Sequence, residues 1–172
     1  MHNIGLSSLL SRYIAVLREL RPYGIESPAD VAEYLFEQAL GGKRTKRGKK
    51  RHDIVVNKLG RVQVKARCLP SDGRKERRLH LGNMNRSSCD YLGAVIFTCD
   101  LHVHRAVLVP ADAVWRLIEE HTDPEKKVQF DLLAALPRSV EMTERLAMIL
   151  DRQERREGAG DVASDSLPRE DM

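Results

Sequence analysis

The sequence has few of the features that mark a secreted, disulfide-linked or membrane-spanning protein. Its three cysteines, Cys68, Cys89 and Cys99, are an odd number without paired metal-binding spacing, which favours reduced thiols in a cytoplasmic protein. No apolar run approaches the ~20 residues that a membrane-spanning helix needs. No basic region followed by an apolar stretch opens the chain, so we expect no secretory signal. These absences predict a cytoplasmic protein with no membrane partner.

Motifs of several enzyme classes are missing as well. The sequence contains no P-loop glycine pattern and no G-x-S-x-G segment, and it offers no convincing Cys/His nucleophile pair. Cys99, His102 and His104 lie close in sequence, but the fourth ligand of a tetrahedral zinc site is not evident. The sequence therefore gives no support to nucleotide hydrolysis, to serine or cysteine hydrolysis, or to structural zinc.

Positive charge is concentrated in the larger part of the chain. The 172 residues carry a net charge of +4, but residues 151–172 carry −3 and residues 1–150 carry +7. A chain of this length is expected to form one domain with a substantial core. Because that domain is the basic part, a polyanionic partner is favoured.

The central feature is a predicted β-hairpin over residues 52–67. Ile54–Asn57 and Val62–Ala66 are rich in β-branched residues, and Lys58–Gly60 supply a turn. Side chains alternate between the two faces of a strand, so Val62 and Val64 share one face and Gln63, Lys65 and Arg67 share the other.

The register of this hairpin decides which side chains meet. A turn centred near Leu59-Gly60 would place Val55 opposite Lys65, with Asp53 diagonal to Lys65 on the same face. A slip of one residue would break that alignment.

A helix is predicted immediately before the hairpin. Ser27 can cap it, Pro28 suits its first position, and Gly41-Gly42 end it. Its acidic residues at spacings of three and seven share a face beside the apolar stripe; they are Asp30, Glu33 and Glu37. A solvated acidic face and a ligand-bearing face are both open interpretations.

Two basic segments flank the hairpin. Residues 43–51 hold seven positive charges in nine residues, which predicts an exposed loop, and residues 74–78 form a second basic stretch after the hairpin. If both contact phosphates, binding should weaken steeply with salt. The predicted DNA-contacting residues are Lys43, Arg44, Lys46, Arg47, Lys49, Lys50, Arg51, Arg67, Arg74, Lys75, Arg77 and Arg78.

Asp53 followed by Gln63-x-Lys65 on the next strand resembles the PD-(D/E)XK nuclease superfamily, over roughly residues 28–120. His52 stands at the position of the motif's proline, which many members lack, and Gln63, which some members carry, stands where others have Asp or Glu. The resemblance implies an α/β fold with a restriction endonuclease-like core: a central mixed β-sheet of about four to five strands, flanked by helices, with an extra N-terminal helix.

The resemblance also implies a site and a function. Asp53 would be the obligatory metal ligand, and Glu33 would add a helix carboxylate, with Glu37 as the runner-up. Gln63 would bind the metal or orient water, the backbone carbonyl of Val64 would complete the ligand shell, and Lys65 would activate the water. With Mg²⁺ or Mn²⁺ bound, such a protein would be an endonuclease that hydrolyses DNA.

The rest of the chain is expected to supply packing. The apolar run at 91–99 predicts a central buried strand, 103–109 its partner strand, and Pro110-Ala111-Asp112 the start of a helix. The predicted organisation is a single domain over 1–156, followed by a disordered acidic tail at 157–172. Within the domain we expect an N-terminal helix at 6–21, a core at 27–121 and a C-terminal helical part at 128–156. That last part includes a helix from 140 to 152.

Two other functions remain open at this point. A catalytically inactive relative would bind DNA through the basic loops 43–51 and 74–78, and its binding would ignore metal. An assembly subunit would form a homodimer through the amphipathic helix at 6–21 and would lack affinity for nucleic acid.

Overall fold

The computed structural model describes residues 15–16, 18–20, 25–45, 52–70, 78–82, 84, 86–120 and 126–160, the last eight by their backbone alone. Most of the predicted N-terminal helix at 6–21, and with it the predicted dimer contact, lies outside these residues. The same holds for residues 46–51 and 74–77 of the basic segments and for 161–172 of the tail.

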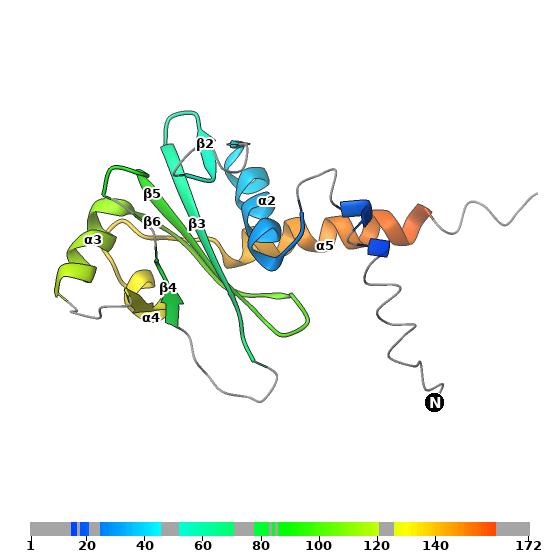
Figure 1. The fold of residues 1–172 in the computed structure, drawn as a ribbon. Coiled ribbons are helices and arrows are strands. Elements are labelled where there is room, and N and C mark those ends of the chain that lie inside the picture. The colour runs from blue at the N-terminus through cyan, green and yellow to red at the C-terminus, as the bar shows by residue number, and fades with distance from the viewer. Residues whose placement is uncertain are drawn as a thin grey trace, which may run out of the picture.

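The described residues form an α/β fold around a mixed sheet, as predicted (Figure 1). Its elements are α2 (Pro28–Leu40), β1 (Lys43–Arg44), β2 (Ile54–Val56), β3 (Gly60–Cys68), β4 (Arg78–His80), β5 (Tyr91–Phe97), β6 (Val103–Pro110), α3 (Ala111–Glu120), β7 (Lys127–Gln129), α4 (Phe130–Ala134), β8 (Val140–Glu141) and α5 (Thr143–Gly160). None of the described helices is both long enough and apolar enough to cross a membrane.

The main sheet has six strands in the order β1-β2-β3-β5-β6-β8, and a separate two-stranded sheet pairs β4 with β7. All neighbours in the main sheet are antiparallel except β3 and β5, which run parallel. In Figure 1, α2 and α5 lie on one side of the sheet, and α3, α4 and β4 lie on the other. The long chain between β3 and β5 is the crossover that a parallel pair requires.

The prediction of four to five strands is wrong because both edges carry an additional strand. β1 and β8 have only two residues each, too few to show an alternating pattern. β8 also takes the first residues of the predicted helix at 140–152, so α5 begins at Thr143, and it continues to Gly160 into the region predicted to be disordered. The predicted strands at 91–99 and 103–109 and the helix after Pro110 are confirmed.

Two hydrophobic clusters hold the layers together. One joins α2 and α5 to the sheet through Phe36, Ile54, Val64, Leu108 and Leu146, among others. The second joins α3, α4 and the small sheet to the opposite face through residues that include Leu79, Leu92, Ile96, Trp115 and Phe130. Because the central strands are covered on both faces, β5 is almost wholly apolar.

The start of α2 is stabilised by its cap. The Ser27 hydroxyl accepts from Asp30 N at 3.4 Å and donates to Asp30 Oδ2 at 2.7 Å, and Glu26 N donates to the same oxygen at 3.0 Å. At the other end, Gly41 has the left-handed φ of 64° that ends many helices. The predicted cap, first-position proline and terminating glycine are confirmed.

We expect Ser27→Ala to lower the free energy of unfolding by about 1 kcal/mol, because the cap of α2 loses its acceptor and Asp30 loses a donor. Urea unfolding would measure the change. Ser27→Thr keeps the hydroxyl and should retain most of the stability, so an equal loss in both variants would contradict this role of the cap.

Candidate active site

The hairpin has a different register from the predicted one. Ile54 pairs with Val62 and Val55 with Arg61, so the prediction that Val55 faces Lys65 is wrong by four residues. The turn closes earlier because Lys58 adopts a left-handed φ of 73°, and Gly60 follows with a φ of 91°. A shift by an even number of residues leaves every side chain on its predicted face.

This register places Asp53 level with Gln63. Asp53 N donates to Val62 O at 3.0 Å, which continues the β2–β3 pairing by one residue. Asp53 Oδ2 accepts from Gln63 Nε2 at 2.5 Å and from Val64 N at 2.6 Å. The carboxylate is therefore held by two donors of the neighbouring strand, one from a side chain and one from the main chain.

The Val64 contact also defines an open edge of β3. β2 begins at Ile54, so beyond this level β3 has no strand partner on that side among the described residues. The N–H and C=O of one strand residue point to the same side, so the Val64 carbonyl faces the edge where Asp53 lies. Gln63 and Lys65 are half-buried on the face opposite the buried Val62 and Val64 side chains.

Burial is the largest influence on Asp53 and raises the pKa of its carboxyl. The hydrogen bond from Val64 N and the positive charges of Lys65 and His52 lower this pKa, and the charge of Asp30 raises it. The site thus contains three charged groups. They are the Asp53 carboxylate, whose burial disfavours ionisation, a nearby lysine and a second carboxylate.

The helix carboxylate whose charge raises the pKa of Asp53 is Asp30, one of the three acidic residues predicted to share a face of α2. Asp30 is 4% exposed. Glu33, the predicted ligand, lies one turn further along and is half-buried, and its role stays a prediction. Glu37, the runner-up, instead holds Arg44 through an ion pair of 2.9 Å and a hydrogen bond to Arg44 N. The sequence placed Asp30 on the same acidic face, but the candidate ligands that it indicated there were Glu33 and Glu37.

The basic residues divide into three groups. Lys43 and Arg78 are exposed. Arg44 and Arg67 are held by other groups of the protein, and Arg44 pairs with Glu37 and lies over the Tyr34 ring. Arg67 donates to the carbonyl of Arg78 at 2.9 Å. The predicted contacts that lie outside the described residues are Lys46, Arg47, Lys49, Lys50, Arg51, Arg74, Lys75 and Arg77.

Both anchors of the first basic loop lie beside Asp53. Thr45 N donates to Asp53 O at 2.8 Å, and the Thr45 hydroxyl donates to His52 O at 2.6 Å. Residues 46–51 therefore leave and rejoin the described structure next to the candidate carboxylate.

The oxygen atoms at the site suit a hard divalent cation. Within the described residues there is no group of three or more His, Cys, Asp or Glu side chains that could hold a metal. Mg²⁺ nevertheless needs only one or two carboxylates, because it keeps several waters. Asp53 supplies a carboxylate, and the Val64 carbonyl faces the same edge. If the Gln63 side-chain amide rotated by 180°, its Oε1 would take the place of Nε2 beside Asp53 and could also bind the cation. A cation would also offset the cost of keeping Asp53 ionised near Asp30. The donors therefore fit Mg²⁺ or Mn²⁺.

No protein-family model and no curated protein matches the chain.

Proposed function

We propose that this protein is a metal-dependent endonuclease that hydrolyses DNA phosphodiester bonds, and that its sheet is a restriction endonuclease-like core. The observation that carries the proposal is the position of Asp53, level with Gln63 and within electrostatic reach of Lys65, at the open edge of β3. The order of α2, the antiparallel pair β2–β3 and the parallel neighbour β5 supports the same core.

In this function each residue has a distinct task. Mg²⁺ or Mn²⁺ would be held by Asp53, Gln63 and the Val64 carbonyl, with Glu33 as the proposed further carboxylate. When bound, the ion would lower the pKa of a water molecule and neutralise negative charge on the phosphate. Lys65 hydrogen-bonds the attacking water and stabilises the negative charge that develops on the phosphate oxygens. The basic segments hold the DNA backbone through Lys43 and residues 46–51 and 74–78.

A second function, DNA binding without cleavage, is favoured by one observation. Gln63 is neutral, and its amide already donates to Asp53, so the pair is satisfied without a cation. In that case the basic loops 43–51 and 74–78 would be the functional surface and the hairpin would only support them.

Incubation with supercoiled plasmid would test the proposal. We expect wild-type protein to nick the DNA with Mn²⁺ or Mg²⁺ and not with EDTA. Lys65→Ala should lower the nicking rate by about 100-fold or more, the range for loss of a proton-transfer group. Lys58→Asn is the matched control: it also removes one lysine from the hairpin, but at the exposed turn, and asparagine tolerates the φ of 73° there.

The two functions give different outcomes in this assay. Equal nicking by wild type and Lys65→Ala would contradict the proposed role of Lys65. If no metal supports nicking, and wild type and Lys65→Ala retard DNA equally in a gel, the protein binds DNA without cleaving it.

A further inference from the structure

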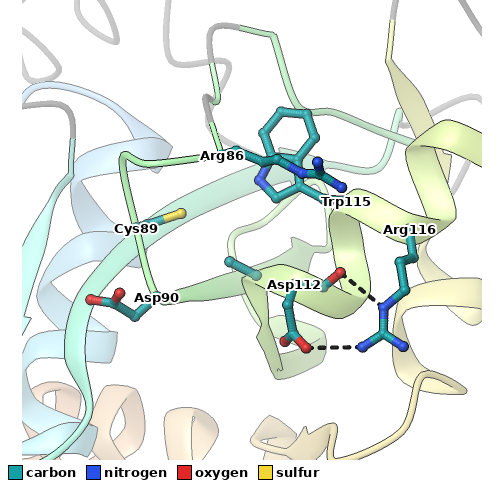
Figure 2. Close-up of a pocket in the computed structure, with 7 residues that line it drawn as sticks. Arg86, Cys89, Asp90, Asp112, Trp115 and Arg116 are labelled. Carbon is teal, nitrogen blue, oxygen red and sulfur yellow. Dashed lines mark hydrogen bonds and ion pairs between the residues drawn. The ribbon is translucent and has the colours of Figure 1, made fainter.

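A pocket of about 500 Å³ lies beside the first residues of β5, apart from Asp53 and Gln63 (Figure 2). One wall is the start of α3, and the other is the chain from Arg86 to Asp90. The lining residues of α3 include Asp112, Trp115 and Arg116, and Cys89 faces them from the other wall. A volume of this size is typical of sites for small organic groups.

The pocket wall is fastened to the strand that carries the candidate active site. Arg61 N and Nε donate to Asp90 Oδ2 at 2.8 and 3.1 Å, and Asp90 N donates back to Arg61 O at 2.7 Å. A Cβ on Gly60 would lie 2.5 Å from the same Asp90 oxygen, so the approach requires glycine there. Asp90 is thereby fixed to β3 two residues before Gln63.

Trp115 lines the pocket and carries a polar group that lacks a hydrogen-bond partner among the described residues. It is 9% exposed, and its buried indole N–H has no hydrogen-bond acceptor among the described residues. The Lys126 ammonium lies 5.5 Å from the ring centroid. An unpaired buried donor costs about 1–3 kcal/mol, and a ligand with an acceptor would recover that free energy.

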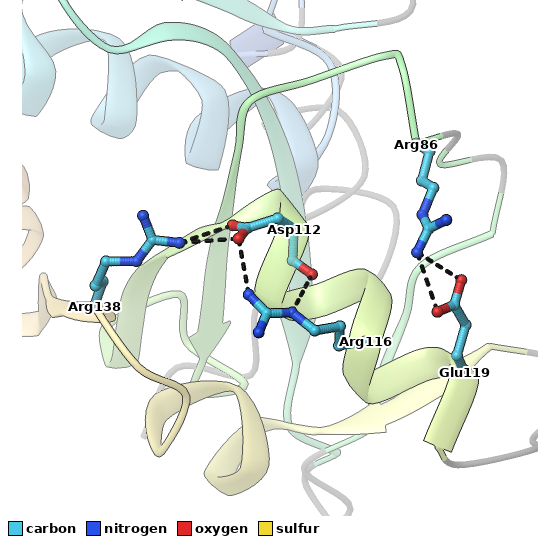
Figure 3. A network of polar contacts seen from close by, with 5 residues as sticks. All are labelled: Arg86, Asp112, Arg116, Glu119 and Arg138. Atoms are coloured by element: carbon cyan, nitrogen blue, oxygen red, sulfur yellow. Dashed lines mark hydrogen bonds and ion pairs between the residues drawn. The ribbon is translucent and has the colours of Figure 1, made fainter.

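The charges at the rim disfavour a simple anion. Arg116 and Arg138 both pair with Asp112 at 2.9 Å, and Arg86 pairs with Glu119 at 2.8 Å (Figure 3). Each of these arginines already has a carboxylate, so an anion would have to displace one. A neutral planar group with an acceptor can instead use the Trp115 N–H and leave these ion pairs in place.

We propose that this pocket binds one unstacked nucleobase of the nucleic-acid substrate. The inference rests on the proposed function and specifies the form of DNA that is recognised: a single strand or a distorted duplex whose base can leave the stack. The indole lines the pocket and provides a donor for a base carbonyl or ring nitrogen.

Trp115 is the only tryptophan of the chain, so its fluorescence reports on the pocket alone. We would titrate the full-length protein, in EDTA, with a short single-stranded oligodeoxythymidylate and with an abasic strand of equal phosphate count. We expect the thymidine strand to change the fluorescence and to bind about tenfold tighter or more, since a hydrogen bond to a buried donor that otherwise has no partner contributes about that much. The abasic strand should bind weakly and leave the emission nearly unchanged.

A matched pair of variants separates the pocket from general electrostatics. Arg116 and Arg138 are 65% and 66% exposed and both pair with Asp112, but only Arg116 lines the pocket. Arg116→Gln should therefore reduce the preference for the base-bearing strand several-fold, and Arg138→Gln should leave it unchanged. Trp115→Phe, read out with 2-aminopurine in the strand, should weaken binding through loss of the N–H.

Equal affinity and an equal fluorescence change for the thymidine and abasic strands would overturn the proposal, and so would equal effects of the two arginine substitutions. Because EDTA prevents cleavage, the result is independent of nuclease activity. If the fluorescence change depends on the base but the protein never nicks plasmid, the nucleobase pocket is supported and the nuclease function is rejected. If the protein nicks plasmid but the fluorescence change does not depend on the base, the nuclease function is supported and the pocket is rejected.

Discussion

Asp53→Asn should abolish metal-dependent nicking and yet make the protein more resistant to unfolding at neutral pH. Activity is lost because a neutral amide is a poor ligand for Mg²⁺. The charge stabilisation that a metal provides is worth several kcal/mol, so the rate should fall by about 1,000-fold or more. The fold should be retained, because asparagine can still accept from Val64 N with its Oδ1.

The stability effect follows from the raised pKa of Asp53. In the unfolded chain the carboxyl ionises near its ordinary pKa of 3.8, whereas burial resists ionisation in the fold. Ionised Asp53 therefore reduces stability increasingly as the pH rises from 3.8 through the folded-state pKa, and the reduction is then constant. Below both pKa values the contribution vanishes.

Urea unfolding in EDTA at several pH values would measure this difference. The advantage of Asp53→Asn over wild type should be small near pH 4 and should grow toward pH 8. Adding Mg²⁺ should stabilise wild type and not the variant, because only the carboxylate favours the bound ion. A wild type that is more stable than the variant at neutral pH in EDTA would contradict the inferred cost of burial.

Phe36→Ala should cause the largest loss of stability, about 3–5 kcal/mol, because it empties the contact between α2 and the sheet. Phe36 is fully buried and packs directly on Gly93 of β5. A Cβ at Gly93 would lie 3.0 Å from Cε1 and Cζ of the ring. The aromatic ring therefore occupies the space that only glycine leaves open. Chemical denaturation with a fluorescence or circular dichroism signal would measure the loss.

A double-mutant cycle would test whether this contact is the cause. Gly93→Ala alone should cost about 1–3 kcal/mol by overpacking. In a Phe36→Leu background the added methyl has more room, so the two changes together should cost less than their sum. Met148→Ala, at a position 52% exposed on α5, is the control and should change stability by no more than about 0.5 kcal/mol. Strict additivity of the two changes would show that the helix is held elsewhere.

The sequence by itself determined the features that depend on near neighbours in the chain. Ser27, Pro28 and Gly41 mark the ends of α2 because caps act within one turn. The apolar run of β5 predicts burial on both faces. The faces of Gln63 and Lys65 follow from the alternation of a strand, whatever the register.

Tertiary structure decided the features that join distant residues. The register that places Asp53 opposite Gln63 depends on the left-handed backbone conformation of Lys58, which the composition of the hairpin does not predict. The two edge strands β1 and β8 exist because a longer strand offers them hydrogen bonds, and their two residues would not form a strand alone. The charge of Asp30 acts on Asp53 only because Phe36 and its neighbours hold α2 against the sheet. The Arg61–Asp90 pair, 29 residues apart, forms only when β5 lies parallel to β3, and no local pattern predicts that pairing.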